Sequence, residues 1–331
     1  MNVAILGAGK IAVAMAKTLA GLERVDGGEI GEKPRRYAVA ARDLGRAKAF
    51  AEQYGFEKAY GSYLEMVCDP EVELVYVATP HSHHAEHVKL CLEHGKHVLC
   101  EKAFTANAKQ AEKILKLAEE KGLLLTEAIW TRYMPSRKMI SDLVERGAIG
   151  TPYMLTANLG YVISDKERLV DPALAGGALL DVGIYPITFA RMVFGSNIKE
   201  IRSAAVLTDR GVDAQNSITF LYEDGKMAVL HSSMMMRSDR KGIIMGDAGY
   251  LEVDNINNPH VIQIFDLQDN LRERHQVPEQ ITGYEYQVIS SVKAIREGRL
   301  ECPEIPHEET MAVMRLMDSL RAEWGVKYPF E

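Results

Sequence analysis

Short runs of apolar residues alternate with amphipathic stretches through the first part of the chain. A short apolar run bounded by turn residues is typical of a buried strand. Apolar residues that recur every three or four positions are typical of a helix that covers one face of a sheet. The pattern predicts a helix starting near Ile11, a polar, glycine-rich connection at 27–34, further helices around Val88 and at 44–54 and 107–121, and strands at 3–6, 37–41, 74–78, 97–100 and 123–126. Because strands and helices alternate, this part is predicted to form a doubly wound parallel sheet.

The pattern changes after Thr126. Neighbouring apolar runs are now joined by short turns, as at Asp224-Gly225, and this is typical of hairpins in an antiparallel sheet. Strands are predicted at 153–162, 218–222 and 227–232 and near Ile243, Leu251 and Ile262, a loop at 164–175, and helices at 135–146, 284–297, 308–324 and from 176 to about 194. We therefore expect an α/β protein with a parallel-sheet domain at 1–126 and an α+β domain at 127–331, the latter built on an open, mostly antiparallel sheet.

Length and composition agree with a two-domain enzyme. A chain of 331 residues is long for a single core, and 47% hydrophobic with 26% charged residues is ordinary for a soluble globular protein. The net charge of −7 argues against a surface for nucleic acid or anionic membrane. No apolar run is expected to span a bilayer, and the N-terminus enters a strand without the basic region of a signal peptide. The four cysteines are scattered without a CxxC motif, so we expect a cytoplasmic protein.

A glycine-rich turn follows the first predicted strand. The residues Gly7-Ala8-Gly9-Lys10-Ile11-Ala12 read GxGxxA between a strand and a helix. In a dinucleotide site the first glycine permits the tight turn, the second lets the pyrophosphate approach the backbone, and the small third residue lets the helix pack on the strand. The helix N-terminus also favours an anion. The alternative is an ordinary tight turn, but the strand–turn–helix context at the N-terminus favours a dinucleotide.

The residue after the second predicted strand bears on the choice of cofactor. NAD sites usually have an acidic residue at this position, but here the strand is followed by Arg42 and only then by Asp43. Arg42 fits a 2′-phosphate, with Arg46 and Lys48 as further positive charges nearby. Alternatively, Arg42 is solvated and Asp43 simply caps the next helix. We favour NADP, with NAD as the alternative.

Polar residues also follow the strands at 74–78 and 97–100. The first is followed by Thr79-Pro80-His81-Ser82-His83-His84, and the second by Glu101-Lys102. Ligands of open parallel sheets bind at the carboxyl ends of the strands, so a lysine there can reach both a cofactor and a substrate. Several histidines lie close together in the sequence, and His83 and His87 have a spacing that metal ligands can have. No completing ligand is apparent, so we expect no metal and place the histidines beside the nicotinamide.

A second pair of candidate residues lies in the later part of the chain. Asp181 and Tyr185 are four residues apart in a predicted helix and should share one face. A phenol next to a lysine ammonium and a carboxylate can transfer protons, because the ammonium favours the phenolate. The alternative is that Asp181 complements the helix dipole and Tyr185 is packing. The presence of Lys102 and of the dinucleotide motif favours a catalytic role for Asp181 and Tyr185.

Four segments in this order, GAGKIA, VATPHSHH, GKHVLCEKA and GGALLDVGIY, resemble the Gfo/Idh/MocA family of oxidoreductases along nearly the whole chain. The tyrosine of the last segment and the stretch 127–135, EAIWTRYMP, are most similar to the dimeric dihydrodiol dehydrogenase branch, which includes NADP-dependent D-xylose dehydrogenases. The resemblance implies an N-terminal Rossmann domain and a homodimer that pairs through the C-terminal sheet. One departure is Ala103, where the family usually has proline. Its loss frees φ and adds an N–H, which could loosen the aim of the lysine before it.

The resemblance also implies roles for individual residues. Lys102 matches the lysine of the family's EKP motif, Asp181 the aspartate of its second motif, and Tyr185 the proton-transferring tyrosine of this branch. Trp130 and Arg132 would line the substrate pocket, although packing at the domain junction and solvation explain them almost as well. The predicted cofactor-binding residues are Gly7, Ala8, Gly9, Lys10, Ile11, Arg42, Thr79, Pro80, His81, His84, Glu101 and Lys102.

The expected function is therefore hydride transfer between NAD(P) and a CH–OH group of a sugar, polyol or cyclic diol. Two alternatives remain. One is a catalytically silent dinucleotide-binding sensor, against which the complete set of Lys102, Asp181 and Tyr185 argues. The other is a lyase or glycosidase that oxidises its substrate transiently with a tightly held cofactor. The expected partners are a small-molecule substrate and a second copy of the chain.

Overall fold

The computed structural model describes residues 1–24 and 33–331, which form two compact units. The first unit contains Met1–Tyr133 and Gln280–Arg315, and the second contains Met134–Glu279 and Leu316–Glu331. The predicted glycine-rich connection at 27–34 lies outside the described residues up to position 32. The chain thus crosses between the units more than once, whereas the sequence predicted a single boundary after residue 126.

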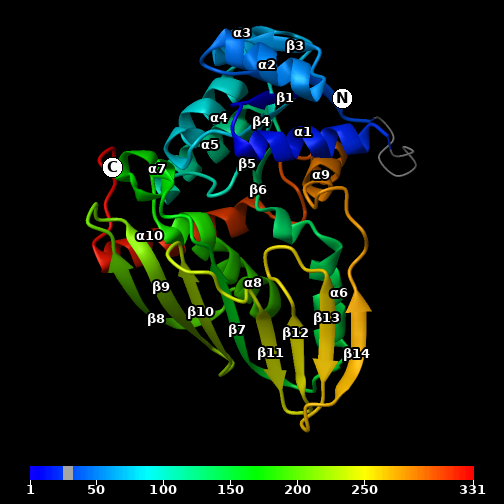
Figure 1. Ribbon diagram of the computed structural model, residues 1–331, viewed down its shortest axis with the longest axis vertical. Coiled ribbons are helices and arrows are strands. Elements are labelled where there is room, and N and C mark those ends of the chain that lie inside the picture. The colour runs from blue at the N-terminus through cyan, green and yellow to red at the C-terminus, as the bar shows by residue number, and fades with distance from the viewer. Residues whose placement is uncertain (25–32) are drawn as a thin grey trace. The chain divides into compact units, whose positions relative to one another are not determined.

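The first unit is built on a six-stranded parallel sheet with the strand order β3-β2-β1-β4-β5-β6 (Figure 1). Its central strands are apolar along their whole length because helices cover both faces of such a sheet. The strands are β1 (Asn2–Leu6), β2 (Arg35–Ala40), β3 (Lys58–Tyr60), β4 (Leu74–Val77), β5 (His97–Glu101) and β6 (Leu125–Ala128). The predicted doubly wound parallel sheet is confirmed.

Helices alternate with these strands, and their ends follow the local capping chemistry. Asp43 and Asn107 are N-caps whose side chains accept the N–H of Arg46 and Gln110, and Gly122 ends a helix in the left-handed conformation. The helices are α1 (Lys10–Leu22), α2 (Leu44–Tyr54), α3 (Tyr63–Cys68), the short η1 (His81–His83), α4 (His84–Glu93), α5 (Ala108–Lys121) and the short η2 (Trp130–Arg132).

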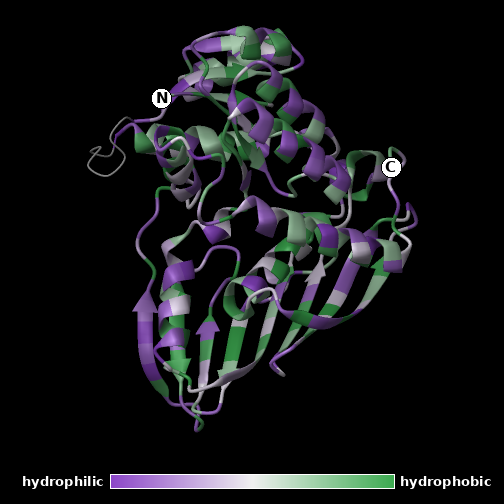
Figure 2. Ribbon diagram, turned by 180° about the vertical axis from the view of Figure 1, so that it is seen from behind, coloured by the Kyte–Doolittle hydropathy of each residue, from purple (hydrophilic) through white to green (hydrophobic). Residues whose placement is uncertain are grey.

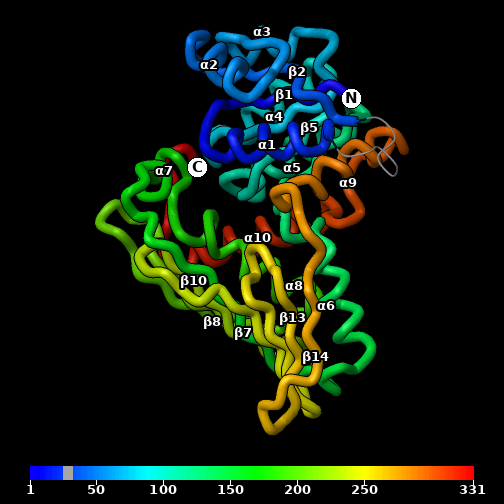
Figure 3. Tube along the Cα trace, turned by 45° about the vertical axis from the view of Figure 1, so that its right-hand side comes forward, coloured from blue at the N-terminus to red at the C-terminus, as the bar shows by residue number. Residues whose placement is uncertain are grey.

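Helix α9 (Glu285–Arg296) returns to the first unit from far along the chain and lies beside α1 (Figures 1 and 3). Val288 and Val292 on α9 are buried in the same core cluster as Ile5, Met15 and Leu19. This apolar stripe explains why the first unit extends beyond the boundary that the sequence predicted. The first part of α10 (His307–Trp324) also belongs to this unit, and its last part belongs to the second.

The second unit contains an eight-stranded sheet with the order β14-β13-β12-β11-β7-β10-β9-β8. All neighbours are antiparallel except β7 and β10, which are parallel, so the prediction of a mostly antiparallel sheet is confirmed. Figure 2 shows β14 as a hydrophilic strand at the edge. The strands are β7 (Pro152–Gly160), β8 (Ile198–Leu207), β9 (Asp213–Tyr222), β10 (Met227–Ser233), β11 (Gly242–Gly246), β12 (Tyr250–Val253), β13 (Val261–Phe265) and β14 (Leu271–Gln276).

Helices cover one face of this sheet. α8 (Ile184–Phe194) packs on β7 and β10, and α6 (Pro135–Glu145) packs on α8. The side chains that alternate towards this face are buried, among them Leu251, Val253, Ile262 and Ile264. The remaining helical segments are α7 (Glu167–Val170), which lies within the predicted loop, the 3₁₀ turn η3 (Pro172–Leu174) and the π-helical turn η4 (Leu179–Gly183), which leads directly into α8.

One apolar stretch in this unit corrects an expectation. Among the described residues, the segment Pro172–Phe194 is long and apolar enough to cross a membrane by length and composition, contrary to the prediction that no such run exists. The structure buries 89% of its most apolar window, and α8 rests on the sheet. The hydropathy is that of a helix in a protein core.

Candidate functional site

The carboxyl ends of the parallel strands gather most of the predicted cofactor residues of the first unit. The chain runs from β1 to β2 and β3 on one side and then places β4, β5 and β6 on the other, so β1 and β4 form the point where the strand order reverses. Ligands of open α/β sheets bind at this point. Gly7 and Thr79 follow these two strands and lie close together, since a carbon added to Gly7 would be 3.3 Å from Cγ2 of Thr79.

The glycine loop has the backbone that a dinucleotide requires. Gly7 has a φ of +106°, and a Cβ there would lie 3.0 Å from the carbonyl oxygen of Ala78, so only glycine fits without strain. Gly9 is the N-cap of α1, and open space lies where its Cβ would be. Ala12 is completely buried. The loop therefore leaves room for an anion against the first N–H groups of α1.

Arg42 stands at the position that distinguishes the two cofactors. It is exposed, two residues beyond the end of β2, and makes no ion pair with any residue that the structure describes. The charge of Arg42 affects the pKa values of two neighbours, His87 and Tyr63. Burial, together with the nearby histidines and Arg42, lowers the pKa of His87 to about 4. Burial raises the pKa of Tyr63, and Arg42 and Arg46 oppose this rise. Arg46 donates to the carbonyl of Ala8 at 2.8 Å. Arg46 thus lies beside the glycine loop.

The histidines after β4 hold two loops together. The ring nitrogens of His84, which is fully buried, lie 2.7 Å from the carbonyl oxygen of Thr79 and 2.9 Å from that of Ala103. Burial lowers the pKa of His84, whereas the two carbonyls raise it. Thr79 Oγ1 is 2.9 Å from Nδ1 of His87. His84 therefore ties the loop after β4 to the loop after β5, and its place beside the cofactor stays a prediction.

Lys102 follows β5 directly, as predicted, and is half-buried. Glu101, whose side chain accepts a hydrogen bond from the phenol of Tyr76, also accepts the N–H of Lys102 at 3.2 Å. The peptide bond between Lys102 and Ala103 is cis. Two neighbours therefore fix the backbone of the lysine, Glu101 before it and His84 through the carbonyl of Ala103 after it.

Glu127 is a buried carboxyl that the sequence did not single out. It belongs to β6 next to the lysine loop and accepts hydrogen bonds from Thr310 Oγ1 and from the N–H of Phe104. Its second carboxyl oxygen has no partner among the described residues. Burial raises the pKa of Glu127 to about 7. A lone glutamate within the apolar run 123–129 is the signal that could have identified it, because an acidic group buried among apolar residues is costly.

In the second unit, Asp181 lies in the π-helical turn η4 and Tyr185 in the first turn of α8. The predicted common face assumed an α-helical spacing, which does not hold over 179–183. Both side chains are largely buried. Arg168 on α7 donates to both carboxylate oxygens of Asp181, with N–O distances of 2.9 and 3.4 Å. Arg168 was not predicted, because the pair joins residues on separate local elements. π-Turns within helices are frequent at functional sites.

The family assignment rests on two profiles and on curated relatives. The profile "Oxidoreductase family, NAD-binding Rossmann fold" matches residues 1–129, and "GFO/IDH/MocA C-terminal domain" matches residues 138–252. The mouse trans-1,2-dihydrobenzene-1,2-diol dehydrogenase is 32% identical over 88% of this chain and 89% of its own length. The chain belongs to the Gfo/Idh/MocA family. The homologue from Xenopus tropicalis, which carries the same name, is also 32% identical and is covered over 98% of both chains.

Two solved structures share the fold of this chain. A 3-ketoreductase from Actinomadura kijaniata, solved with NADP and TDP-benzene, superposes with a TM-score of 0.86 at 27% identity over 97% of both chains. A levoglucosan dehydrogenase solved with NADH shares the fold with a TM-score of 0.86 over 99% of both chains, at 18% identity. The family makes the chain an oxidoreductase with a Rossmann domain, and structures solved with NADP and with NADH share its fold.

Two predicted substrate residues are anchored within the first unit of this Gfo/Idh/MocA protein. The indole of Trp130 stacks on the ring of Tyr284 at 4.2 Å. Arg132 is buried, donates through Nε to the carbonyl of Glu304 at 2.9 Å and pairs with Glu309 at 2.9 Å. The alternative interpretation, that Arg132 is solvated, is therefore wrong. Whether either residue contacts substrate stays a prediction.

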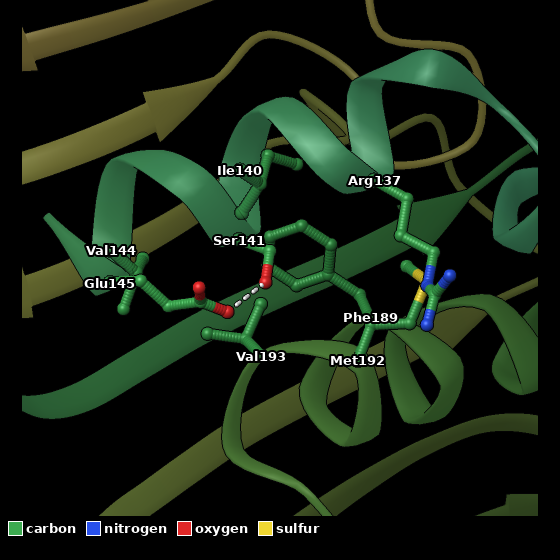
Figure 4. A pocket seen from close by; sticks show the side chains of 8 residues that line it. All are labelled: Arg137, Ile140, Ser141, Val144, Glu145, Phe189, Met192 and Val193. Carbon is green, nitrogen blue, oxygen red and sulfur yellow. Dashed lines mark hydrogen bonds between the residues drawn. The ribbon is translucent and has the colours of Figure 1, made fainter.

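A small cavity lies apart from all of these residues. It has a volume of about 70 Å³ and opens between α6 and α8 of the second unit (Figure 4). None of the predicted site residues lines it, and Figure 4 shows the hydroxyl of Ser141 turned to Glu145 rather than into an organised polar cluster. Its lining residues are Arg137, Ile140, Ser141, Val144, Glu145, Phe189, Met192 and Val193. We assign it no part in the reaction.

Proposed function

We propose that the protein is an NADP(H)-dependent dehydrogenase or reductase acting on a CH–OH group of a sugar, polyol or cyclic diol. The observation that carries the proposal is the carboxyl edge of the parallel sheet. There, a glycine loop open to an anion follows β1, the exposed Arg42 follows β2 and the half-buried Lys102 follows β5. The residues present fit a dinucleotide with a 2′-phosphate. NAD would leave Arg42 without its proposed partner.

The substrate class is supported by the relatives. The curated relatives are named for oxidation of a dihydrodiol, and two structural neighbours are a 3-ketoreductase and a levoglucosan dehydrogenase. Each of these names refers to the oxidation of a substrate or to the reduction of a ketone. We infer that a ring or chain with neighbouring hydroxyls is the substrate of this chain as well.

Bound NADP⁺ would accept a hydride from the carbinol carbon. In our proposal Lys102 holds the substrate oxygen, and Tyr185 takes the hydroxyl proton as general base while the alcohol becomes a carbonyl. In the reverse direction Tyr185 returns the proton. Asp181, kept in place by Arg168, accepts a second hydroxyl of the substrate or orients the lysine. These roles rest on the motifs of the family and on the placement of each residue within its own unit.

The experiment is a screen for turnover. Sugars, polyols and cyclic diols are offered with NADP⁺ or NAD⁺, and the corresponding ketones with NADPH or NADH, and the nicotinamide absorbance is followed. Tyr185→Phe should lower kcat by about 10²–10⁴-fold, as for loss of a positioned proton-transfer group, and Lys102→Ala at least as much. NADPH binding should survive Tyr185→Phe.

Tyr153→Phe and Lys109→Ala are matched controls, because both residues are exposed. Wild-type release of NADPH with an alcohol excludes both a silent sensor and a lyase that recycles its own cofactor. Near-normal turnover in both active-site variants would contradict the roles of Tyr185 and Lys102, and His81, His83 and His84 would be the next candidates.

We also propose that the protein forms a homodimer through the outer face of the second sheet. The helices α6 and α8 cover the opposite face. Registered strand pairs place a row of half-exposed apolar side chains across six neighbouring strands of the outer face. A continuous apolar row of this kind is typical of an interaction surface. Its members are Phe265, Tyr250, Met245, Met154, Met227 and Leu221.

A further inference from the structure

Asp213 is a buried carboxyl beneath the segment that carries Asp181 and Tyr185. It is the first residue of β9 and is 1% exposed. Its Oδ2 accepts the backbone N–H of Leu179 at 2.8 Å and the side-chain amide of Asn216 at 2.9 Å. Leu179 is the first residue of η4, the turn that contains Asp181. A side chain of the sheet is therefore hydrogen-bonded to the start of the proposed catalytic segment.

The glycine pair that precedes this turn is fitted to the same carboxylate. Gly177 has a φ of +119°, and a Cβ there would collide with Oδ1 of Asp213. A Cβ on Gly176 would lie 2.6 Å from the carbonyl oxygen of Leu169, and the carbonyl of Gly176 accepts the phenol of Tyr328 at 2.8 Å. The backbone before η4 is thus held on several sides, and glycine is required where Asp213 approaches it.

Further polar groups continue beneath the turn. The hydroxyl of Ser232 on β10 donates to Asn216 Oδ1 at 3.0 Å, and Asn216 donates to Asp213. A Cβ on Gly183 would lie 3.0 Å from Oγ of Ser232. Ser232, Asn216 and Asp213 therefore form one buried chain of hydrogen bonds that is joined to the first residue of η4 and passes close to its last residue.

We propose that Asp213 is a positioning residue that sets the place of Asp181 and Tyr185 by accepting the N–H of Leu179. The inference rests on the proposed function, because it assumes that these two residues act in the reaction. In this proposal Asp213 acts through the oxygen that accepts the N–H of Leu179, and its negative charge is not needed. Burial raises the pKa of Asp213 to about 7. Arg321, the cation whose charge reaches it, is already paired with Glu331 and Asp318.

The test compares Asp213→Ala with Asp213→Asn, and uses Asp209→Asn as the control because Asp209 is exposed in the turn before β9. Asparagine keeps an oxygen that can accept from Leu179 and Asn216, whereas alanine removes it. We expect Asp213→Ala to lower kcat on the order of 10²-fold, as for a misplacement of about 1 Å, with the Kd for NADPH unchanged. Asp213→Asn and the control should stay within about threefold of wild type.

Hydrogen–deuterium exchange supplies a readout that does not need a substrate. Peptides covering 177–185 should lose protection in Asp213→Ala and keep it in Asp213→Asn. If Asp213→Ala does not fold, Asp213→Ser, whose hydroxyl is too short to reach Leu179, takes its place. Wild-type kcat and protection without the acceptor, or equal losses in the alanine and asparagine variants, would overturn the proposal. Absence of turnover in the wild type would overturn the proposed function alone, because the exchange result still decides on Asp213.

Discussion

Replacing Glu127 with glutamine should make the first unit more stable, relative to the wild type, at alkaline pH than at acidic pH. The carboxyl is completely buried, and its pKa rises from the ordinary 4.5 to about 7. Between these two values the unfolded chain releases the proton and the folded chain keeps it. The wild type therefore loses stability as the pH rises from below 4.5 to above 7. Each tenfold change in the acid constant is worth about 1.4 kcal/mol, so the full loss is about 3 kcal/mol.

Glutamine has no proton that titrates in this range, so the stability of the variant does not fall in this way as the pH rises. It can accept from Thr310 and Phe104 as the carboxyl does, but it puts an amide N–H₂ where the unpartnered oxygen lies. That substitution costs about 1–3 kcal/mol at every pH. The pH-independent cost cancels when the difference between Glu127→Gln and wild type is compared at pH 5 and at pH 8. The variant should gain about 2–3 kcal/mol on the wild type over this interval.

Urea unfolding followed by tryptophan fluorescence measures this double difference. The chain has two tryptophans, and Trp130 lies in the first unit, so a Trp324→Phe background reports on that unit. Glu119→Gln, which replaces an exposed glutamate of α5, is the matched control and should show no such gain. An equal effect of Glu127→Gln at both pH values would refute the assignment of a buried proton to this residue.

Three further predictions concern the nucleotide loop, the cofactor and assembly. Arg42→Ala should weaken NADPH binding by about 10- to 100-fold, as for loss of a charge-assisted contact, with little change for NADH in fluorescence titrations; equal affinities of the wild type for both would contradict the 2′-phosphate contact. Gly7→Ala should lower the midpoint of thermal unfolding, because a residue with a side chain that is forced to a φ of +106° costs about 1–3 kcal/mol of stability. Gly9→Ala should keep this midpoint and weaken only nucleotide binding, because the space for its Cβ is open. An unchanged midpoint in Gly7→Ala would show that the turn tolerates a side chain. Met154→Arg, in the middle of the outer apolar row, should convert a dimer to a monomer in light scattering, and a wild type that is monomeric at micromolar concentration would exclude the proposed dimer.

The elements that the sequence predicted well are determined by their own residues. Strands β1, β4 and β5 are short apolar runs, and the hairpin from β9 to β10 has its glycine, Gly225, at a positive φ of +86°. Each of these patterns is local. Helix ends were predictable for the same reason, since a cap acts within one turn.

The strands that were not predicted depend on partners far away in the sequence. β14 has the sequence LRERHQ and shows no apolar alternation, yet it pairs along its length with β13. β8 lies at the other edge and is largely exposed, and β3 has three residues. An edge strand is held by backbone hydrogen bonds to its neighbour, and its own side chains carry little of that information. The parallel pair of β7 and β10 is likewise invisible to a search for hairpins.

The candidate site divides in the same way. Gly7, Arg42, Thr79 and Lys102 each follow a strand, so the rule for parallel sheets is enough to predict that they meet at one edge. Glu127, Arg168 and Asp213 escaped notice because each acts through a backbone N–H or a side chain from another element. A single acidic residue has no motif, and only burial reveals that it must have a function or a partner.

The return of α9 to the first unit has a consequence for synthesis of the chain. The nucleotide-binding unit lacks Val288 and Val292 in its core until residues near the C-terminus have been made. Domains usually fold in the order in which they leave the ribosome, but here the larger segment of the second unit, Met134–Glu279, interrupts the first unit. It can pack its sheet while the N-terminal sheet still has an apolar surface uncovered. A ribosome that stalls before residue 285 would therefore release a nascent chain whose older half is the part in need of a chaperone.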